Sequence, residues 1–574
     1  MGSIADTLSA SCGYTGSEKN GLGQSRVTWQ KSPPHLKDLG TLQRTLGPIT
    51  TADLFKADCY GQKSKSGIDV RKFLSREGRI RQPSSLKASV GELGEDMISL
   101  GTGRPSPDTY PFERMEFAYS LPNASAWAAP PSVKSNSSEG QQGSAVVRKQ
   151  DPSASMDLSI ALSYGYSLGS EQLIQYLTTH VSHVHGPPYS DWEICLTGGN
   201  TPAMETAFRN FADPGDFILV EEYTYSGMIE AATALGLNMV PVEMDEDGLT
   251  PRSLDNILST WNELQPGKPT PRLLYTIPTG HNPTGITQPR HRRQEILDVA
   301  EKHDIMILED DPYYYLLFPH SWSDSETPAL PSYLSLSQTG RVMRLDSTSK
   351  ILAPGLRLGW LTAPKAIVET FQAAHDLGFI HPSGLSQLAV YKLVSETWGH
   401  AGFLHWLKAL AGNYQEKAAV ILNSMKIELG RGVLADVCSW SDIRAGMFIW
   451  LKVDCRRLVD MSRTPMDAEA RHKALLSIED RIYMEGLKEG VLACKGSHFR
   501  APALTCNGVS RSNGQLVDGP GRSLAEDENA VFFRLTFASA GEASLVTAVG
   551  RLGLALRKIF TPVSGEAAPE TPSH

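Results

Sequence analysis

The residues of this chain best suited to chemistry surround one lysine, Lys350. Ser347 and Ser349 precede it, and Arg357 follows it seven positions later. A lysine amine forms Schiff bases with carbonyl compounds when its site lowers the pKa of the amine and holds it still. Hydroxyls and a guanidinium suit phosphate oxygens, because short donors and a planar fork match them. The pattern favours a phosphorylated carbonyl cofactor. A plain Ser/Thr-rich surface turn is the weaker interpretation, because it does not explain the arginine seven residues after the lysine.

Pyridoxal 5'-phosphate is such a cofactor, and its pyridine ring would need a carboxylate. Asp310 and Asp311 come just after the apolar run 305–308. A negative charge beside a pyridine nitrogen favours the protonated ring, which then accepts electrons from the substrate. An acidic loop that caps a strand is the alternative interpretation.

Two predicted turns carry further polar groups. Asn282 begins an Asn-Pro-Thr-Gly sequence after the apolar run 273–277. This sequence forms a β-turn by itself, because proline fixes φ and glycine accepts a positive φ. Gly199 and Asn200 stand before a predicted helix. Backbone amides at a helix N-terminus, made accessible by glycines, bind phosphate.

Arg534 is the single charge in the apolar run 532–537. Burial of an unpaired guanidinium is costly, so this side chain needs an anionic partner. The planar fork of arginine matches a carboxylate at two points. The partner is therefore either the carboxylate of a ligand or an acidic residue of the protein itself.

Four of these stretches, which follow one another along the chain in the order expected of the family, resemble the fold-type I pyridoxal-phosphate aminotransferases, in the branch that handles aromatic amino acids and 2-aminoadipate. The resemblance covers roughly residues 80–560. It implies an α/β fold of the type I transferases, with a large domain built on a mixed, mainly parallel sheet and a smaller α+β domain. It also implies pyridoxal 5'-phosphate as the cofactor.

The resemblance assigns roles around the cofactor ring. Asp310, three residues before a tyrosine, pairs with the pyridine nitrogen, rather than Asp311. Tyr313 and Asn282 hydrogen-bond the phenolic oxygen of the cofactor. Tyr225 matches the aromatic residue that stacks on the ring.

Other positions follow from the same resemblance. Tyr223 competes with Tyr225 for the stacking role, and Tyr164 matches a tyrosine that reaches across a dimer interface to the neighbouring phosphate. An obligatory homodimer with shared active sites is the consequence. Five residues are expected to bind the cofactor's own phosphate: Gly199, Asn200, Ser347, Ser349 and Arg357.

The implied reaction is a ping-pong transamination in which Lys350 holds the cofactor as an internal aldimine and later moves the substrate's α-proton. Arg534 binds the α-carboxylate of the amino acid. Gly103 and Arg104 border the side-chain pocket, where Arg104 can meet the distal carboxylate of glutamate or 2-aminoadipate. The expected substrates are tyrosine, phenylalanine or tryptophan with a 2-oxo acid such as 2-oxoglutarate.

Two alternatives remain. A 2-aminoadipate, kynurenine or specialised-pathway aminotransferase would share every residue named. Some bacterial regulators join a DNA-binding winged helix to this fold, and residues 1–90 carry 14 Lys and Arg against 7 Asp and Glu. No pair of well-capped amphipathic helices is predicted before residue 80, which argues against such a regulator.

The composition excludes several classes of protein. A length of 574 residues predicts more than one domain, and a hydrophobic content of 41% with 20% charged residues is typical of a globular protein. The net charge of −9 argues against general binding of nucleic acid. No apolar run approaches the roughly 18 residues that span a bilayer, and the start lacks the features of a signal peptide.

The cysteines predict the compartment. Seven of them are scattered without a C-x-x-C pair or other metal-ligand spacing. Such a pattern predicts reduced thiols, no metal site and an intracellular protein. The expectation is a cytoplasmic enzyme with no membrane or nucleic-acid partner.

The elements that must position these residues alternate along the chain. Apolar runs at 217–220, 273–277 and 305–308 predict buried strands, and the helical period of 290–303 predicts a helix between two of them. Strand, helix, strand with short joints predicts a parallel sheet.

The expected organisation is, in order: an N-terminal arm, largely flexible, at 1–80; the N-terminal part of the small domain at 81–160, with a low-complexity loop at 129–156; the large cofactor-binding domain at 161–395; the C-terminal small domain at 396–560, with a flexible insertion at 502–529; and a disordered tail at 561–574.

Overall fold

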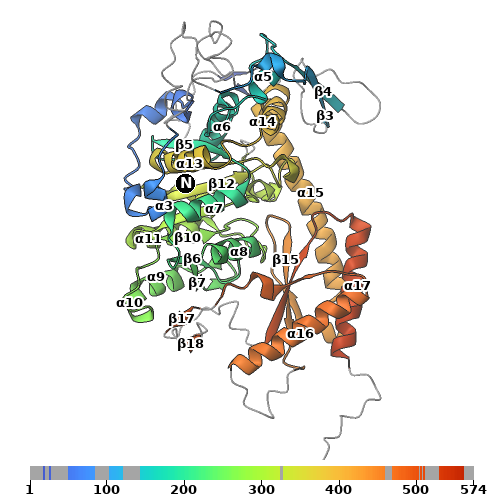
Figure 1. Ribbon diagram of the computed structural model, residues 1–574. Helices are drawn as coiled ribbons and strands as arrows, with labels where there is room; N and C mark the ends of the chain where they lie inside the picture. Colours follow the sequence, from blue (N-terminus) through green and yellow to red (C-terminus); the bar gives the residue numbers. More distant parts are fainter. Residues whose placement is uncertain are drawn as a thin grey trace, which may run out of the picture. The chain divides into compact units, whose positions relative to one another are not determined.

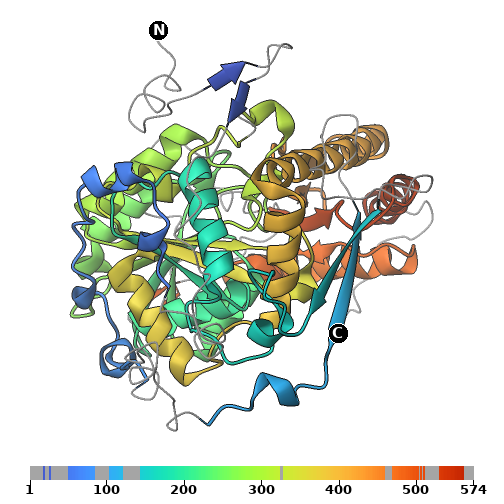
Figure 2. The same ribbon diagram turned by 90° about the horizontal axis from the view of Figure 1, so that it is seen from above.

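A computed structural model describes most of the chain; Figure 1 labels its elements, and Figure 2 shows the same ribbon turned by 90°. It describes residues 17–19, 25–27, 50–84, 103–120, 142–323, 327–458, 468–502, 504–506, 509–510 and 529–561. The chain falls into two compact units: unit 1 is Met1–Asn210, Ser332–Ser349 and Ala353–Phe403, and unit 2 is Phe211–Pro331, Lys350–Leu352 and Leu404–His574. The units interleave along the sequence, and the predicted domain boundaries stay predictions.

Unit 1 is built on three antiparallel strands, with β13 (Gly359–Pro364) between β5 (Trp192–Thr197) and β12 (Val342–Ser347). All three are buried along their length, and the two buried charges of β12, Arg344 and Asp346, pair with each other over 2.8 Å. In the register, Gly359 is opposite Thr197 on one side and Ser347 on the other. The residues that follow β5 and β12 are therefore brought to the start of β13.

Helices cover these strands, and α6 and α13 pack on β5. Their bounds are α5 (Leu158–Ala161), α6 (Glu171–Val184), α7 (Asn200–Phe211), α12 (Tyr333–Leu336), η8 (Pro354–Leu356), α13 (Lys365–Leu377), α14 (Gly384–Tyr391) and the π-helix η9 (Lys392–Thr397).

The N-terminal part of the described chain also has regular structure. Residues 50–80, assigned from the sequence to a flexible arm, contain three 3-10 helices and α3, and α3 is capped by Ser75, whose hydroxyl accepts from the Gly78 amide over 2.8 Å. The elements are β1 (Ser17–Lys19), β2 (Ser25–Val27), η2 (Ala52–Leu54), η3 (Asp58–Gln62), η4 (Val70–Lys72), α3 (Arg76–Ile80), η5 (Pro107–Thr109), β3 (Arg114–Ser120) and β4 (Gln142–Arg148).

The predicted loop 129–156 needs a correction at its end. Strand β4 lies inside this range and pairs with β3 in an antiparallel hairpin. Val146 and Val147 explain the strand, because β-branched residues favour the extended backbone. Residues 121–141 lie outside the described residues.

Unit 2 begins with four parallel strands, in the order β11, β10, β6 and β7. Their bounds are β11 (Met306–Asp310), β10 (Leu273–Thr276), β6 (Phe217–Glu221) and β7 (Asn238–Val242). The three runs predicted as strands are β6, β10 and β11, and the predicted helix is α11 (Arg290–Lys302). These predictions are confirmed, and the strand-helix-strand order makes the fold α/β as expected.

Helices and short strands connect and flank these four strands. They are α8 (Ser226–Ala234), β8 (Met244–Asp245), β9 (Gly248–Leu249), α9 (Pro251–Ser259), α10 (Trp261–Leu264), α11, η6 (Tyr314–Leu316) and η7 (Pro319–Ser321).

The C-terminal part of unit 2 is an antiparallel sheet in the order β14, β15, β19 and β16. The strands are β14 (Cys438–Trp440), β15 (Phe448–Asp454), β19 (Ala530–Thr536) and β16 (Cys494–Lys495). The remaining elements are α15 (Gly399–Glu428), η10 (Gly432–Leu434), α16 (Ala468–Lys488), η11 (Gly496–Phe499), β17 (Thr505–Cys506), β18 (Val509–Ser510) and α17 (Glu542–Phe560). Strands β17 and β18 lie inside the predicted insertion 502–529.

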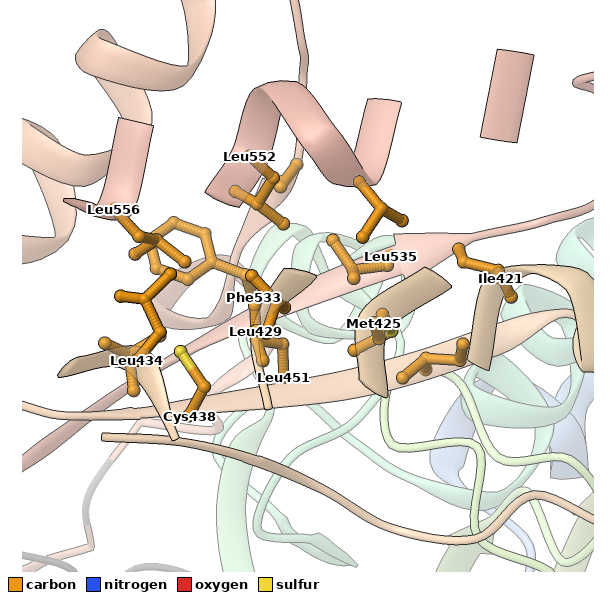
Figure 3. Packing of buried hydrophobic residues seen from close by; sticks show 14 of the residues in the cluster. Ile421, Met425, Leu429, Leu434, Cys438, Leu451, Phe533, Leu535, Leu552 and Leu556 are labelled. Atoms are coloured by element: carbon orange, nitrogen blue, oxygen red, sulfur yellow. The ribbon is translucent and has the colours of Figure 1, made fainter. Parts of the chain in front are cut away.

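The two faces of this antiparallel sheet differ. Leu451 and Phe533 point into an apolar core with Met425 and Leu552 from the helices (Figure 3). Because side chains alternate along a strand, Trp450 and Arg534 lie on the other face, opposite each other in the β15–β19 register. A helix-packed core on one face thus fixes the strand that carries Arg534.

The structure bears on two expectations from composition, the absence of a membrane-spanning segment and the reduced state of the cysteines. No helix in the described ranges is long and apolar enough to cross a membrane. Cys195, Cys438, Cys455 and Cys494 are free. Cys59 is disulfide-bonded, so the prediction that all seven cysteines are reduced is wrong for this one.

Candidate active site

Lys350 lies in the turn that follows β12 and is half-buried. The turn is closed by Thr348, whose backbone amide and hydroxyl both donate to the Leu358 carbonyl, over 3.1 and 2.8 Å. One residue beyond the lysine, the Ile351 carbonyl accepts from the Trp406 indole over 2.8 Å. The backbone on both sides of Lys350 is therefore held in place.

Unit 1 gathers the residues predicted to bind phosphate. The Ser347 hydroxyl donates to that of Ser349 over 2.8 Å, and the Ser349 amide donates to Ser347 Oγ over 3.1 Å. Arg357 donates through Nη2 to the Gly198 carbonyl over 3.0 Å. The loop after β5 and the loop after β12 are thus joined by the arginine side chain.

Gly199 has a backbone conformation that favours glycine and lies close to Arg357. Its φ is +104°, and a Cβ at this position would lie 2.7 Å from Arg357 Nη2. Helix α7 begins at the next residue, Asn200, whose side-chain amide donates to the Leu345 carbonyl over 3.2 Å. A helix N-terminus, a guanidinium and two hydroxyls within one unit make a concentrated set of anion donors.

Asp310 ends β11 and is 5% exposed. Its Oδ2 accepts a hydrogen bond from the hydroxyl of Tyr275 over 2.7 Å. Tyr275 was not identified from the sequence. The one feature that could have pointed to it is a hydroxyl within an apolar run. Asp311 has a different partner, because its Oδ2 accepts a hydrogen bond from the Thr279 hydroxyl over 3.1 Å.

Asn282 connects a tyrosine to an arginine. Its Oδ1 accepts from Arg534 Nη1 over 2.8 Å, and its side chain also hydrogen-bonds Tyr313. Burial, with the nearby charge of Asp310, raises the pKa of Tyr313 above its ordinary value. The Tyr313 phenol therefore stays protonated and can act as a donor.

The Asn282 turn is fixed by close packing on β15. Gly285 has a φ of +73°, and a Cβ there would lie 2.4 Å from the Phe448 carbonyl oxygen. Phe448 in turn packs edge-on against Tyr313, with ring centroids 5.6 Å apart. Direct backbone contact with β15 explains how Asn282 reaches Arg534.

Arg534 lies between two aromatic rings. Its guanidinium carbon is 4.6 Å from the Phe448 ring centroid and 4.5 Å from that of Phe499. Its Nη2 contacts Cys494 Sγ at 3.6 Å, a residue that sequence reasoning did not assign. No carboxylate among the described residues pairs with Arg534. The guanidinium edge can therefore meet an external carboxylate at two points, which disfavours an internal salt bridge.

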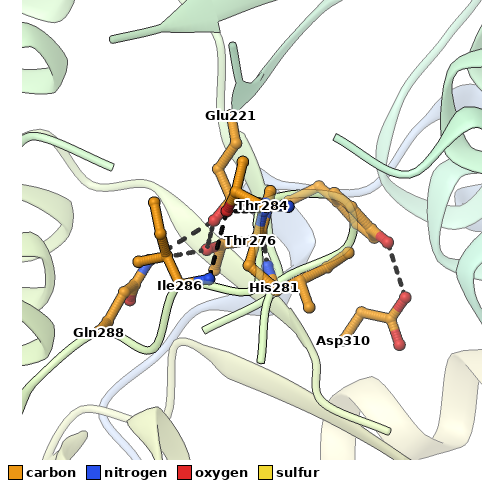
Figure 4. A network of polar contacts seen from close by, with 9 residues as sticks. Glu221, Thr276, His281, Thr284, Ile286, Gln288 and Asp310 are labelled. Atoms are coloured by element: carbon orange, nitrogen blue, oxygen red, sulfur yellow. Dashed lines mark hydrogen bonds and ion pairs between the residues drawn. The ribbon is translucent and has the colours of Figure 1, made fainter. Parts of the chain in front are cut away.

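A buried network of hydrogen bonds supports the turn that carries Asn282 (Figure 4). Glu221, with no exposure, accepts from the Thr276 hydroxyl over 2.7 Å and from the Ile277 amide over 3.1 Å. His281 Nε2 lies 3.0 Å from Glu221 Oε2, and His281 Nδ1 lies 2.8 Å from Thr284 Oγ1. His281 is thus a neighbour of the site, and Glu221 is a supporting residue that the sequence did not reveal.

The two tyrosines that compete for the stacking role differ in environment. Tyr223 is buried against Trp450 and Phe532, with centroid distances of 5.2 and 5.5 Å. Tyr225 precedes α8, is half-buried and lies near enough to influence the pKa of Tyr313. Tyr225 remains the candidate, because Tyr223 is a core residue.

The other predicted site residues lie in unit 1. Tyr164 is 55% exposed. No atom of the described residues lies within 4 Å of a Cβ placed on Gly103, and Gly101 and Thr102 lie outside those residues. Burial lowers the pKa of Arg104, and its buried Nη1 has no hydrogen-bond partner among the described residues.

The structure therefore groups the predicted residues in two sets. Unit 2 brings together Asp310, Tyr313, Asn282, Arg534 and Tyr225, and holds Lys350. Unit 1 brings together Gly199, Asn200, Ser347, Ser349 and Arg357.

Comparisons with known proteins give a consistent result. The family model described as aminotransferase class I and II matches residues 135–502. The chain is 38% identical to the aminotransferase swnA of Arthroderma benhamiae, over 85% of this chain and 91% of the relative. It is 32% identical to an L-tyrosine:2-oxoglutarate aminotransferase of Serpula lacrymans, over 85% and 96%. The solved aminotransferase Aro8 of Candida albicans superposes with a TM-score of 0.73 at 30% identity, over 87% of this chain and all of that one.

Proposed function

Since the chain belongs to the family of class I and II aminotransferases, and so is a pyridoxal phosphate-dependent enzyme, we propose that it transfers the amino group of an aromatic L-amino acid to 2-oxoglutarate. Arg534 carries the proposal, because its guanidinium lies between two phenyl rings and pairs with no carboxylate among the described residues. The Serpula relative is named for tyrosine and 2-oxoglutarate, which supports both substrates.

The residues present fit the cofactor. Its phosphate matches the donors around Gly199, where the φ of +104° strains any residue other than glycine. Its pyridine nitrogen matches the carboxylate of Asp310, and its phenolic oxygen matches Asn282 and Tyr313. When bound, the cofactor supplies the carbonyl that takes up the amino group and a ring that withdraws electrons.

Lys350 has two proposed tasks. Its Nζ would hold the cofactor when the cofactor is bound, and the free, neutral amine would take the proton from the substrate's Cα as a general base. The fixed backbone on both sides supports this role, since a base must stay within hydrogen-bond reach of the proton. Tyr225 is proposed to cover the cofactor ring and exclude water.

Arg534 and Arg104 divide substrate recognition. Arg534 is proposed to bind the α-carboxylate of every substrate, because its fork is oriented by Asn282 and by two rings. Arg104, beside Gly103, is proposed to bind the distal carboxylate of 2-oxoglutarate. Its buried Nη1 has no hydrogen-bond partner in the described part of the chain, which supports that task, since a buried donor gains most from a charged acceptor.

The enzyme is further proposed to be a cytoplasmic homodimer with shared active sites. Tyr164 supports the dimer, because an aromatic residue this exposed is well suited to cover a neighbouring chain. Sedimentation of the pure protein tests the dimer, and Tyr164→Ala tests the shared site through weaker cofactor binding.

The runner-up function is transfer from 2-aminoadipate, kynurenine or a specialised-pathway amine, which uses the same residues. The remote alternative, a regulator, predicts a salt-dependent shift of duplex DNA. A substrate panel distinguishes them: the yellow colour of the loaded protein should bleach with tyrosine and return with 2-oxoglutarate. Bleaching by 2-aminoadipate alone would contradict the aromatic assignment.

A further inference from the structure

We propose that Tyr275 is a positioning residue of this enzyme, which orients the Asp310 carboxylate toward the cofactor's ring nitrogen through its hydroxyl. The proposal rests on the function proposed above, because it takes Asp310 as the partner of that nitrogen. It adds a residue outside the set that the sequence identified.

Strand pairing places the two residues. Tyr275 on β10 is in register with Leu308 on β11, and Asp310 lies two residues beyond Leu308. Side chains two residues apart on a strand share a face, so Tyr275 and Asp310 project to the same side of the parallel strands. The phenol reaches diagonally to Asp310 Oδ2 over 2.7 Å.

Burial makes this hydrogen bond consequential. Tyr275 has no exposure, and Asp310 is 5% exposed. A carboxylate withdrawn from water needs donors to remain charged and in one orientation. Burial and the adjacent Asp310 hold the pKa of Tyr275 well above its ordinary value. The phenol thus stays protonated and serves Asp310 as a permanent donor.

Backbone pairing holds the strand that carries Tyr275. The backbone of β10 is paired with β11 and β6 on its two sides. The next residue, Thr276, lies on the opposite face, where its hydroxyl donates to Glu221 over 2.7 Å. Two consecutive residues of one strand thus hold two different carboxylates, and Tyr275→Phe removes one hydroxyl while keeping the ring in the core.

The test measures binding of pyridoxal phosphate and of its deaza analogue, in which a carbon replaces the ring nitrogen, by equilibrium dialysis. Tyr275→Phe should weaken binding of pyridoxal phosphate about tenfold to a hundredfold, the usual effect of losing a hydrogen bond to a charged group. Binding of the analogue should change little, because it has no nitrogen for Asp310 to meet. A general loosening of the site would weaken both.

A matched control is Tyr314→Phe, another buried tyrosine, whose hydroxyl donates to the Leu330 carbonyl over 2.8 Å. It should leave the ratio of the two affinities unchanged. In steady state, Tyr275→Phe should lower kcat with little change in the KM for tyrosine, because Arg534 is untouched.

Asp310→Asn separates failure of this inference from failure of the proposed function. If Asp310→Asn binds pyridoxal phosphate and its analogue in the wild-type ratio, the role of Asp310 is wrong. If Asp310→Asn changes the ratio and Tyr275→Phe does not, the role of Tyr275 is wrong and that of Asp310 stands. The expected result is that Tyr275→Phe has no further effect on the ratio in the Asp310→Asn background.

Discussion

Arg534 Nη1 donates to Asn282 Oδ1 over 2.8 Å and thereby ties β19 to a turn 252 residues earlier in the chain. The turn packs its backbone directly against β15, the strand beside β19. Arginine and asparagine are thus set relative to each other by the main chain and by their own hydrogen bond. This relationship underlies the first prediction.

Arg534→Ala should lower kcat/KM for every amino-acid donor by about 100-fold, because a two-point bond to a carboxylate is lost, worth about 3 kcal/mol. Arg534→Lys keeps the charge without the fork and should recover only part of the activity. Steady-state kinetics with tyrosine, phenylalanine and tryptophan measure this. A loss confined to one donor would show that Arg534 reads the side chain.

Lys350→Ala should abolish turnover, because no other residue is proposed to take the α-proton. Lys365→Ala, on the exposed start of α13, is the matched control and should keep full activity. Borohydride reduction of the loaded protein followed by peptide mapping should find the cofactor on Lys350. Continued catalytic cycling in the variant would refute the assignment.

Arg104→Leu should raise the KM for 2-oxoglutarate about tenfold or more, since a buried charged hydrogen bond is lost. The KM for a monocarboxylic 2-oxo acid such as phenylpyruvate should stay near the wild-type value. Kinetics with the two acceptors measure the difference. Equal effects on both would place Arg104 outside the acceptor pocket.

Glu221→Gln should lower the free energy of unfolding by about 1–3 kcal/mol, because a buried carboxylate that accepts several hydrogen bonds is replaced by an amide. Glu230→Gln, on the exposed side of α8, is the control and should change it little. Denaturation in urea measures both. A wild-type stability in Glu221→Gln would mean that the network in Figure 4 contributes nothing.

Stability should fall on acidification because of a pair of histidines, the buried His180 and the half-buried His400. His180 Nδ1 lies 3.0 Å from His400 Nε2, and burial lowers the pKa of His400 to about 4 and that of His180 well below its ordinary value. His183 and Arg344 face His180 and also disfavour its charge. The unfolded chain binds protons first, so stability is full above the unfolded pKa near 6.5 and declines as pH falls toward 4.

Urea denaturation at a series of pH values measures this decline. In His180→Gln, the slope of the free energy of unfolding against pH should be shallower between pH 6.5 and 4 than in the wild type. His320→Gln, an exposed histidine, should keep the wild-type slope. Equal slopes in all three proteins would contradict the role of the pair.

Much of the site could be predicted because its residues follow strands in short, recognisable sequences. Lys350, Asp310 and Asn282 each come just after an apolar run, so local pattern and resemblance together located them. The strands β6, β10 and β11 and the helix α11 were predicted for the same reason, since hydrophobic periodicity is a local property.

The residues that were missed act across long distances in sequence. Tyr275 contacts Asp310 only because β10 pairs with β11, and Glu221 meets His281 only because β6 lies on the other side of β10. Cys494 reaches Arg534 through strand register alone. The strand β4 was missed because a polar, low-complexity run hid its short apolar centre.

The amino-acid sequence by itself determined the chemistry available to this protein: an amine, a carboxylate, a phosphate-binding loop and a carboxylate-binding arginine, each with its local backbone. Tertiary structure alone decided which partner each group has. It also decided whether Arg534 pairs with an acidic residue of the protein, and which of Tyr223 and Tyr225 is buried. The reason is physical, because composition and periodicity act within a few residues, whereas hydrogen bonds and burial depend on which strands and helices pack together.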